Sequence, residues 1–239
     1  MKDSVEERIG RHQFEDYFDC ERYFMDSHFE NIFTVLDISG KDGGFYGALR
    51  ERYPDLKYSS LDTDKKSLEN GKKLYPNAKF IHSDFFTYTP QERFDVVVYF
   101  QQLPLSLNWK RVLGKLVSLS DQNIFIECRF RLDGSTISDP DLSFSYYCGL
   151  KDSKWNDNAK KVPWIIVNAY EFVSYCLGSF PVSKLELYGY YQDPPPPHFV
   201  PMDRKRIIAA CCWITLDKIH LIDGRNAIVE WNIPGTSYQ

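Results

Sequence analysis

The chain has 239 residues, of which 43% are hydrophobic and 16% aromatic, so it is long enough to bury a substantial core. Its formal net charge of −4 and its pI near 5.8 argue against a long phosphate backbone as a partner. No apolar run approaches the roughly 20 residues of a membrane helix, and the N-terminus lacks the apolar centre of a signal peptide. We therefore expect a cytoplasmic protein with a small-molecule partner, no nucleic acid and no membrane, and we leave a homodimer open.

The first half of the chain alternates short apolar runs with helical patterns. Strands that are apolar on both faces and separated by helices are typical of a parallel sheet covered on both sides. The pattern predicts strands at 33–39, 57–62, 79–83, 94–100 and 123–130, and helices at 45–53, 65–74 and 109–119. The fold class is therefore predicted to be α/β and doubly wound, with helices on both faces of a mostly parallel sheet.

The second half departs from this alternation. Residues 131–163 are polar, rich in aromatic residues and longer than an ordinary connection, which predicts a functional insert or lid after the fifth strand. Beyond it we expect a helix at 167–177 and strands at 183–191 and 206–216. These two strands should pair antiparallel, because no helix separates them. Asp223 and Gly224, between apolar stretches, predict a hairpin at the C-terminus.

A single domain of four parts is expected from this pattern. The parts are an N-terminal helical segment (1–32), a ligand-binding core (33–130), an insert or lid (131–166), and the C-terminal part of the sheet with a tail (167–239).

Six cysteines are scattered along the chain without a CxxC pair, and several lie in apolar runs. We expect reduced core residues and no metal site. They are Cys20, Cys128, Cys148, Cys176, Cys211 and Cys212.

Three of the predicted strands end at or beside an aspartate: Asp37, Asp62 and Asp84. In an open parallel sheet, ligands bind at the carboxyl ends of the strands. The first aspartate is followed by "SGKDGG", whose glycines let a ligand approach the backbone. Carboxylates at strand ends can accept hydrogen bonds from ribose hydroxyls. This spacing favours a ligand that contains adenosine.

These residues resemble the class I S-adenosylmethionine-dependent methyltransferases of the small-molecule type. The first motif of that family, D-x-G-x-G-x-G, is similar to "LDISGKDGG", in which Ser39 and Lys41 stand at two glycine positions and Gly43 at the third. Later motifs of the family are similar, in the same order, to "SLDTDKKSLENGKKL", "AKFIHSDFF" and "FDVVVYFQQLPLSLNWKRVLGKL". The resemblance covers residues 33–130, and it implies a seven-stranded sheet with an antiparallel strand near the C-terminus.

The resemblance also implies a cofactor, S-adenosylmethionine, with S-adenosylhomocysteine as its product. Asp37 would lie near the methionine amino group, Asp62 would bind the ribose hydroxyls, and Asp84 would address the adenine amino group. The other cofactor-binding residues that it implies are Ser39, Gly40 and Gly43 in the loop, Thr63, Phe85, and Tyr99, Phe100 and Gln101 below the reacting methyl.

Candidate residues for binding the methyl acceptor alternate at the end of the fifth strand, in "FIECRFR". Glu127, Arg129 and Arg131 share one face if the strand continues. The two arginines are then candidates for clamping a carboxylate or phosphate of the acceptor. In the alternative, which we weigh equally, one arginine pairs with Glu127 and the other is solvated.

The catalytic candidates are Glu127 and His198, since a general base is needed only if the acceptor is a hydroxyl or a protonated amine. In the insert, Tyr146, Tyr147 and Trp155 are candidates for walling an acceptor pocket. The alternative is that these aromatic residues anchor the insert to the core.

The sequence thus predicts an enzyme that transfers a methyl group by in-line displacement to a small acceptor. The acceptor is an oxygen or nitrogen nucleophile, and an anionic, sugar or nucleotide-linked metabolite of polysaccharide or natural-product biosynthesis is favoured. Two alternatives stay open: a noncatalytic binding or scaffold protein of the same fold, and a methyltransferase that acts on a macromolecule. A dinucleotide-binding oxidoreductase is disfavoured, because "SGKDGG" does not supply G-x-G-x-x-G.

Overall fold

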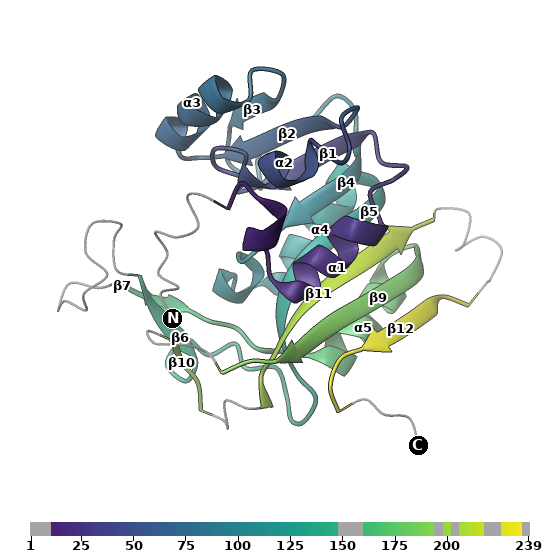
Figure 1. The fold of residues 1–239 in the computed structure, drawn as a ribbon. Coiled ribbons are helices and arrows are strands. Elements are labelled where there is room, and N and C mark those ends of the chain that lie inside the picture. The colour runs from purple at the N-terminus through teal and green to yellow at the C-terminus, as the bar shows by residue number, and fades with distance from the viewer. Residues whose placement is uncertain (1–10, 148–159, 194–197, 202–205, 218–225, 236–239) are drawn as a thin grey trace. The chain divides into compact units, whose positions relative to one another are not determined.

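The computed structural model describes residues 11–147, 160–193, 198–201, 206–217 and 226–235 (Figure 1). The chain forms two compact units. Unit 1 comprises residues 1–100 and 114–125, and unit 2 comprises residues 101–113 and 126–239. Helix α4 (Trp109–Leu119) and strand β5 (Ser120–Arg131) each have one part in either unit.

Unit 1 is built on parallel strands in the order β3-β2-β1-β4, and the first half of β5 follows β4. The carboxyl ends of parallel strands lie at the same edge of a sheet. In the register of the sheet, Asp37 of β1 lies beside Ser60 of β2 and Val98 of β4. The strands are β1 (Thr34–Ile38), β2 (Lys57–Asp62), β3 (Lys79–His82) and β4 (Phe94–Tyr99).

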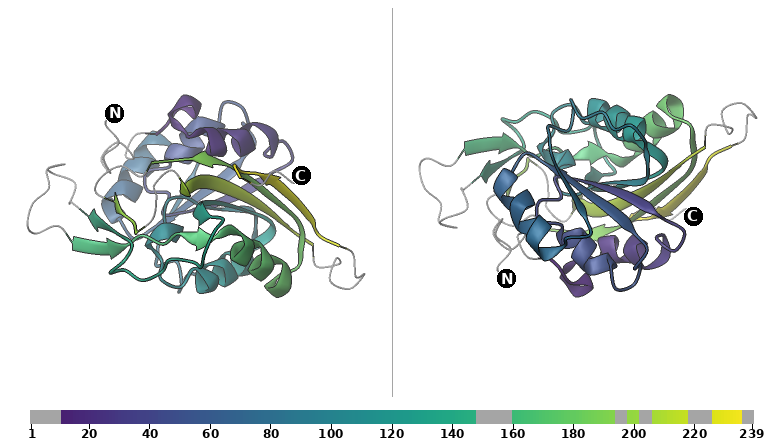
Figure 2. Two further views of the ribbon diagram at one scale, coloured as in Figure 1. Left: turned by 90° about the horizontal axis from the view of Figure 1, so that it is seen from below. Right: turned by 90° about the horizontal axis from the view of Figure 1, so that it is seen from above.

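Helices cover both faces of this sheet, with α1 and α2 on one side and α4 on the other (Figure 2). The handedness of the crossovers requires this for α2 and α4. The connection from β1 to β2 and the connection from β4 to β5 run in opposite directions across the sheet, so two right-handed crossovers place their helices on opposite faces. Helix α3 begins where the Asp64 carboxylate accepts hydrogen bonds from the backbone N–H groups of Lys66 and Ser67. The helices are α1 (Asp19–Ser27), α2 (Gly44–Leu49) and α3 (Lys65–Leu74), with a 3₁₀ turn η2 (Phe14–Asp16) before α1.

Unit 2 contains the antiparallel strand pair that the sequence predicts. Strand β11 (Ile208–Leu216) pairs antiparallel with β9 (Val182–Tyr191) along most of its length. The order in this unit is β12-β9-β11-β5, and β8 (Val167–Asn168) pairs with β5. Strand β12 (Ile228–Asn232), the second arm of the predicted hairpin, pairs in parallel with β9. The Asp223 and Gly224 turn lies outside the described residues.

Helix α5 (Ala169–Ser179) begins two residues later than predicted. The side chain of Asn168 caps it by accepting a hydrogen bond from the Glu171 N–H at 3.0 Å, so Val167 and Asn168 are free to extend along β5 as β8. The helix packs on the sheet of unit 2 through aromatic contacts, with ring centroids 5.1 Å apart for Phe130 and Phe172.

Two strands of the insert and a third strand after β9 form a small antiparallel sheet, which the weak periodicity of these segments did not predict. Its order is β10-β6-β7, with β6 (Phe144–Tyr147), β7 (Lys160–Pro163) and β10 (His198–Phe199). The segment after β7 is tied to the 3₁₀ turn η3 (Leu103–Leu105), because the Ile165 N–H donates to the Pro104 carbonyl at 2.6 Å. Trp164 is buried beside Ile137 and Ile166, so this aromatic residue anchors the insert.

The predicted fold class is confirmed, with its parallel core, its helices on both faces and its antiparallel strand near the C-terminus. Strands β8 and β12 are additional to the seven strands that the resemblance implies. Helix α2 ends at Leu49, four residues before the predicted end, and residues 51 and 52 form a turn.

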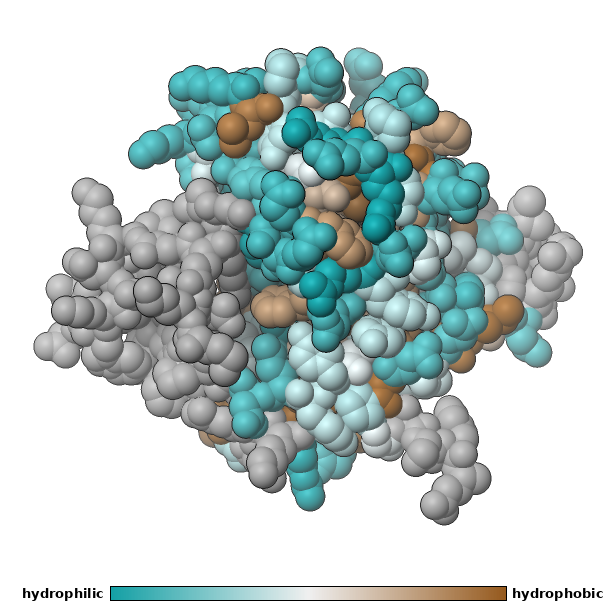
Figure 3. All heavy atoms as spheres, in the orientation of Figure 1, coloured by the Kyte–Doolittle hydropathy of each residue, from teal (hydrophilic) through white to brown (hydrophobic). Residues whose placement is uncertain are grey.

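The cysteines lie in the core where the structure describes them, as expected. Cys20, Cys128, Cys176, Cys211 and Cys212 are buried, and Cys148 lies outside the described residues. Within the described ranges, no group of three or more metal-ligating side chains could hold an ion, and no helix is long and apolar enough to cross a membrane. On the face shown in Figure 3, hydrophobic residues are scattered among hydrophilic ones.

Two glycines in helices of unit 1 give a matched test of packing. A Cβ at Gly71 of α3 would meet the ring of Phe80, with Cζ at 2.6 Å, and the Asp42 carbonyl at 2.8 Å, whereas a Cβ at Gly114 of α4 meets nothing within 4 Å. We expect Gly71→Ala to lower the free energy of unfolding by about 1 to 3 kcal/mol. Gly114→Ala should raise it by up to about 1 kcal/mol, because alanine favours helix. Urea denaturation measures both, and equal effects would contradict the packing described here.

Candidate functional site

Asp37, near the carboxyl end of β1, is a buried acid in an enclosed position. Only 6% of its surface is exposed, and its Oδ2 accepts a hydrogen bond of 2.6 Å from the Tyr58 hydroxyl on β2. The backbone of Gly40 closes over the same oxygen, since a Cβ there would lie 2.6 Å from Oδ2. Burial raises the pKa of Asp37 to about 7, the Tyr58 hydrogen bond opposes this rise, and the charge of Asp62 adds to it.

The loop after β1 has a left-handed backbone at three positions: Ser39 (φ 61°), Lys41 (φ 48°) and Gly43 (φ 83°). Side chains disfavour this conformation, and glycine adopts it freely. Ser39 and Lys41 therefore keep the backbone shape that the glycines of the family motif favour.

Hydrogen bonds to β2 hold this loop in place. The Ser39 N–H donates to the Leu61 carbonyl at 2.7 Å, and the Ser60 hydroxyl donates to the Lys41 carbonyl at 3.1 Å. The Lys41 N–H donates to Oδ2 of Asp62 at 3.2 Å. The loop is thus fixed against the strand that carries the second acid.

Asp62 ends β2 and ties three segments together. Its other oxygen, Oδ1, accepts from the Asp64 N–H at 2.8 Å, so the carboxylate links the loop, the strand and the start of α3. Each carboxylate oxygen has a second lone pair with which to accept a ligand hydroxyl. Thr63 beside it is exposed, and its carbonyl lies 3.1 Å from Nε2 of His82.

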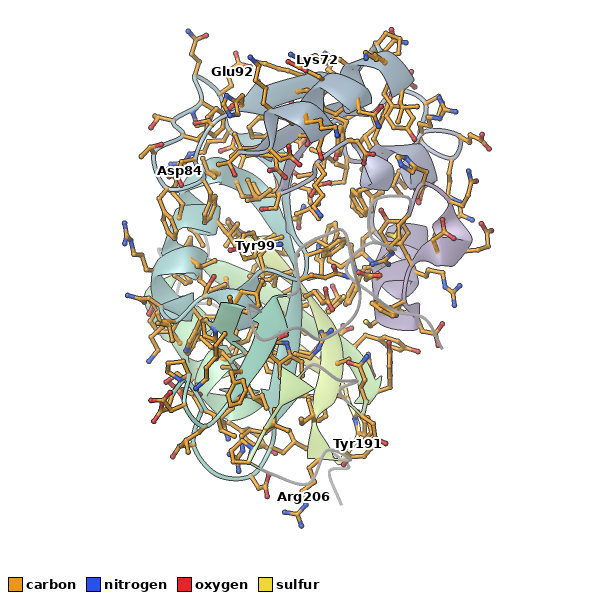
Figure 4. The ribbon with its side chains drawn as sticks, turned by 90° about the vertical axis from the view of Figure 1, so that its left-hand side faces the viewer. Lys72, Asp84, Glu92, Tyr99, Tyr191 and Arg206 are labelled. Atoms are coloured by element: carbon orange, nitrogen blue, oxygen red, sulfur yellow. The ribbon has the colours of Figure 1, made fainter. Side chains whose placement is uncertain are left out.

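Asp84 and Phe85 follow β3. The Asp84 carboxylate accepts from the N–H groups of Phe86 and Thr87 at 2.9 and 3.0 Å, which fixes the turn. The Phe85 ring lies 5.4 Å from that of Tyr99, at the end of β4. Figure 4 shows Asp84 at the periphery of unit 1 and Tyr99 toward its interior.

Two further residues of the implied cofactor set follow Tyr99. The ring of Phe100 packs in an aromatic cluster, 4.7 Å from Phe125 and 5.3 Å from Phe45, so this side chain serves the core of unit 1. Gln101 begins unit 2 and, among the residues that the structure describes, is the third that has a left-handed backbone without being glycine, at φ 59°. Such strain after a strand end is typical of a functional site.

In unit 2, Arg129 is paired with Glu127. Its Nη1 donates to Oε1 of Glu127 at 2.6 Å, and the two side chains are 9% and 1% exposed. Oε2 of Glu127 is buried and has no hydrogen-bond partner within the described ranges. The pairing of one arginine with Glu127, which is the first half of the alternative, is observed, whereas the other arginine is not simply solvated.

Arg131 has different partners. Its Nε donates to the Asp133 carbonyl, and its Nη2 lies 3.8 Å from the Asp133 carboxylate, which also binds Arg206 at 2.7 Å. Arg129 and Arg131 therefore do not form one clamp in this structure. Arg131 lines a cavity of about 410 Å³ together with Ser135, Thr136, Ile137, Ser138, Asp139, Leu142 and Pro201.

Three of the remaining candidates, His198, Tyr146 and Tyr147, belong to strands β10 and β6 of the small sheet. The backbone of His198 in β10 pairs with Ser145 in β6, next to Tyr146 and Tyr147. The side chains of His198, Tyr146 and Tyr147, and all of Trp155, lie outside the described residues, so their roles stay predictions.

Tyr58 and Ser60 are site residues that our sequence reasoning missed. Tyr58 donates to Asp37 of β1 and Ser60 donates to the loop after it, and with Asp62 they alternate along β2. The period of two in "YSSLD" was the available signal, because it places all three side chains on one face.

The fold is that of the class I methyltransferases, so the resemblance seen in the sequence is confirmed at the level of the fold. The N-terminal domain of EvdMO1, crystallised in the presence of SAH and D-fucose, matches 84% of each chain with a TM-score of 0.58 and 10% identity. The O-methyltransferase from a trans-AT PKS multienzyme of Brevibacillus brevis, in complex with S-adenosyl-L-homocysteine, matches 82% of this chain and 70% of its own, with a TM-score of 0.52 and 13% identity.

Comparison of sequences gives a match to only a short part of the chain. No protein-family model matches the chain. A protein named probable inactive O-methyltransferase 11, from Dictyostelium discoideum, is 37% identical over 59 residues. That match spans 24% of this chain and 18% of the relative, so it covers less than a fifth of the relative's length.

The left-handed loop positions give a direct test of strain. We expect Lys41→Gly and Ser39→Gly each to raise the free energy of unfolding by about 0.5 to 1 kcal/mol. Glycine removes the steric penalty of the left-handed backbone, and this gain is larger than the extra conformational entropy that glycine loses on folding. Lys41→Ala is the matched control, since it removes the long side chain but keeps the Cβ. Urea denaturation of the three variants decides the matter: equal gains for glycine and alanine at position 41 would mean that the backbone is not strained there.

Proposed function

We propose that this protein binds S-adenosylmethionine at the carboxyl edge of β1, β2 and β3 and transfers its methyl group to a small acceptor. The observation that carries the proposal is the loop after β1. It keeps a left-handed backbone at Ser39, Lys41 and Gly43 although two of these residues are not glycine. Such a conformation persists only where its surroundings impose it, and it is the conformation that lets a ligand approach the backbone.

The residues of unit 1 fit this cofactor. The Asp37 carboxylate, when ionised, can pair with an ammonium group. Gly40 lets the loop backbone lie close to Asp37 and Ser60, because a Cβ there would clash with both. Asp62 is assigned to the ribose hydroxyls, with Thr63 beside it. Asp84 and Phe85 are assigned to the adenine.

The bound cofactor would supply an electrophilic methyl group on a sulfonium sulfur. The protein then has to align the acceptor, exclude water and take up the proton that the acceptor loses. Glu127 and His198 are the proposed bases. For Glu127, support comes from Oε2, which has no partner among the described residues while Oε1 is held by Arg129.

We further propose that the acceptor is anionic or a sugar or nucleotide-linked metabolite, methylated on oxygen or nitrogen. Arg131 supports this, because it lines a cavity together with Ser135 and Ser138, and a guanidinium is suited to bind a carboxylate or phosphate. Tyr146, Tyr147 and Trp155 are proposed to wall the acceptor side. Solved neighbours hold small molecules, D-fucose with EvdMO1 and N-methylheliamine with coclaurine N-methyltransferase.

A second candidate is a noncatalytic protein that keeps the fold. It is favoured by the two replaced glycine positions and by the 59-residue similarity to a protein named as probably inactive. Calorimetric titration with S-adenosylhomocysteine and a turnover screen separate the outcomes. Binding with turnover supports the enzyme, binding without turnover supports the second candidate, and no binding contradicts a cofactor site.

The cofactor assignment predicts the effect of Asp62→Asn. The amide loses the charge that strengthens hydrogen bonds from ribose hydroxyls, so S-adenosylhomocysteine should bind more weakly by roughly 2 kcal/mol. Asp84→Asn should cost less, because adenine is also held by stacking. Calorimetry measures both affinities, and circular dichroism verifies the fold. Unchanged affinity in folded Asp62→Asn protein would remove Asp62 from the site.

The acceptor assignment predicts a difference between two arginines that share Asp133. Arg131 lines the cavity, while Arg206 binds the same carboxylate and is exposed. For an acceptor found by the turnover screen, Arg131→Met should lower kcat/KM at least about tenfold with unchanged cofactor affinity. Arg206→Met should change it less than about twofold. Phosphate should compete with the acceptor, and if neither variant nor phosphate has an effect, a neutral acceptor is the better explanation.

A further inference from the structure

The hydrogen bond between Tyr58 and Asp37 constrains how the acid can meet a ligand. Oδ2 of Asp37 is occupied by the Tyr58 hydroxyl at 2.6 Å and is covered by the backbone of Gly40. The Tyr58 ring is itself held, because it is 3% exposed and stacks on Tyr46 with centroids 5.1 Å apart. A rigid donor on one oxygen leaves Oδ1 as the atom available to an ammonium group.

We propose that Tyr58 is a positioning residue for the cofactor, which orients Asp37 with Oδ1 toward the ligand and sets the pH range in which the site accepts an ammonium group. This inference rests on the proposed function, since it takes the methionine end of S-adenosylmethionine as the ligand of Asp37. Neither the family's glycine motif nor its acidic motifs contain Tyr58.

The groups around Asp37 decide the direction of the effect. Tyr58 and Asp62 act on it from β2, and Tyr17, from the segment before α1, is coupled to it by charge. Burial and the Asp62 charge favour the protonated acid, and the Tyr58 hydrogen bond favours the carboxylate. The pKa of Tyr58 is raised well above its ordinary value, first by burial and then by the charge of Asp37, so its hydroxyl stays a donor at neutral pH.

The pH dependence follows from these directions. With the pKa of Asp37 at about 7, the acid is protonated in the unliganded protein below that pH and must release a proton to pair with an ammonium group. Affinity for S-adenosylhomocysteine, which carries the same ammonium group, should rise as the pH increases through about 7. Removing the Tyr58 hydroxyl removes the interaction that favours the carboxylate, so the rise should move to higher pH.

The experiment compares the parent protein with Tyr58→Phe, using S-adenosylhomocysteine as the probe between pH 5.5 and 9. Calorimetry in buffers of different ionisation enthalpy gives both the affinity and the number of protons released. We expect the midpoint of the rise to shift upward by about one pH unit in Tyr58→Phe. Tyr46→Phe is the matched control: it removes a hydroxyl from the stacked neighbour, for which no hydrogen bond to Asp37 is observed, and it should keep the parent profile.

The pH profiles of the variants decide whether Tyr58 acts on Asp37. A Tyr58→Phe profile that coincides with the parent profile overturns the inference, and Asp37→Asn should abolish the rise if Asp37 causes it. If the parent protein binds no S-adenosylhomocysteine at any pH, the proposed function fails. The inference about Tyr58 is then decided on the unliganded protein by a carbon-13 NMR titration of the Asp37 carboxyl. Its midpoint should be higher in Tyr58→Phe, and equal midpoints refute it.

Discussion

The contact between the loop after β1 and strand β2 is the constraint on which the candidate cofactor site depends. Backbone and side-chain hydrogen bonds from Ser39, Lys41 and Ser60 fasten the loop to the strand, and the Asp62 carboxylate joins both to the start of α3. The loop in turn covers Asp37, which makes this acid buried. The shape of the site and the raised pKa of its acid therefore have one origin.

Several elements could be predicted from the sequence to the residue, because local signals and burial agree. Strand β2 and helices α3 and α4 have the expected bounds: Lys57–Asp62, Lys65–Leu74 and Trp109–Leu119. For α3, the Asp64 cap marks the beginning. The strands of the small sheet were not predicted because they are only two to four residues long, too short for a period of two to be recognised.

The sequence predicts which acidic residues stand at the strand ends of the candidate site, but it does not predict which charged side chains pair with one another. The acids follow from strand ends, which sequence patterns locate. Partner choice depends on tertiary geometry: Glu127 takes Arg129, two residues along β5, while Arg131 turns to Asp133 in the following loop. Gly134 permits this second pairing, since its backbone is left-handed and a Cβ there would crowd the Arg131 guanidinium. The alternation in "FIECRFR" indicates a shared face but not how charges are distributed on it.

In the proposed function, cofactor binding and turnover would rest on different kinds of structure in this protein. The loop that would receive the cofactor is defined by backbone conformation and by hydrogen bonds to the main chain, so it tolerates serine and lysine where the motif that it resembles has glycine. Turnover would depend on particular side chains of unit 2, of which Glu127 is already committed at one oxygen to Arg129. A buried carboxylate oxygen without a partner is costly unless a hydrogen-bond donor meets it. Oε2 of Glu127 is therefore the atom of unit 2 at which a donor group of a methyl acceptor would bind most favourably.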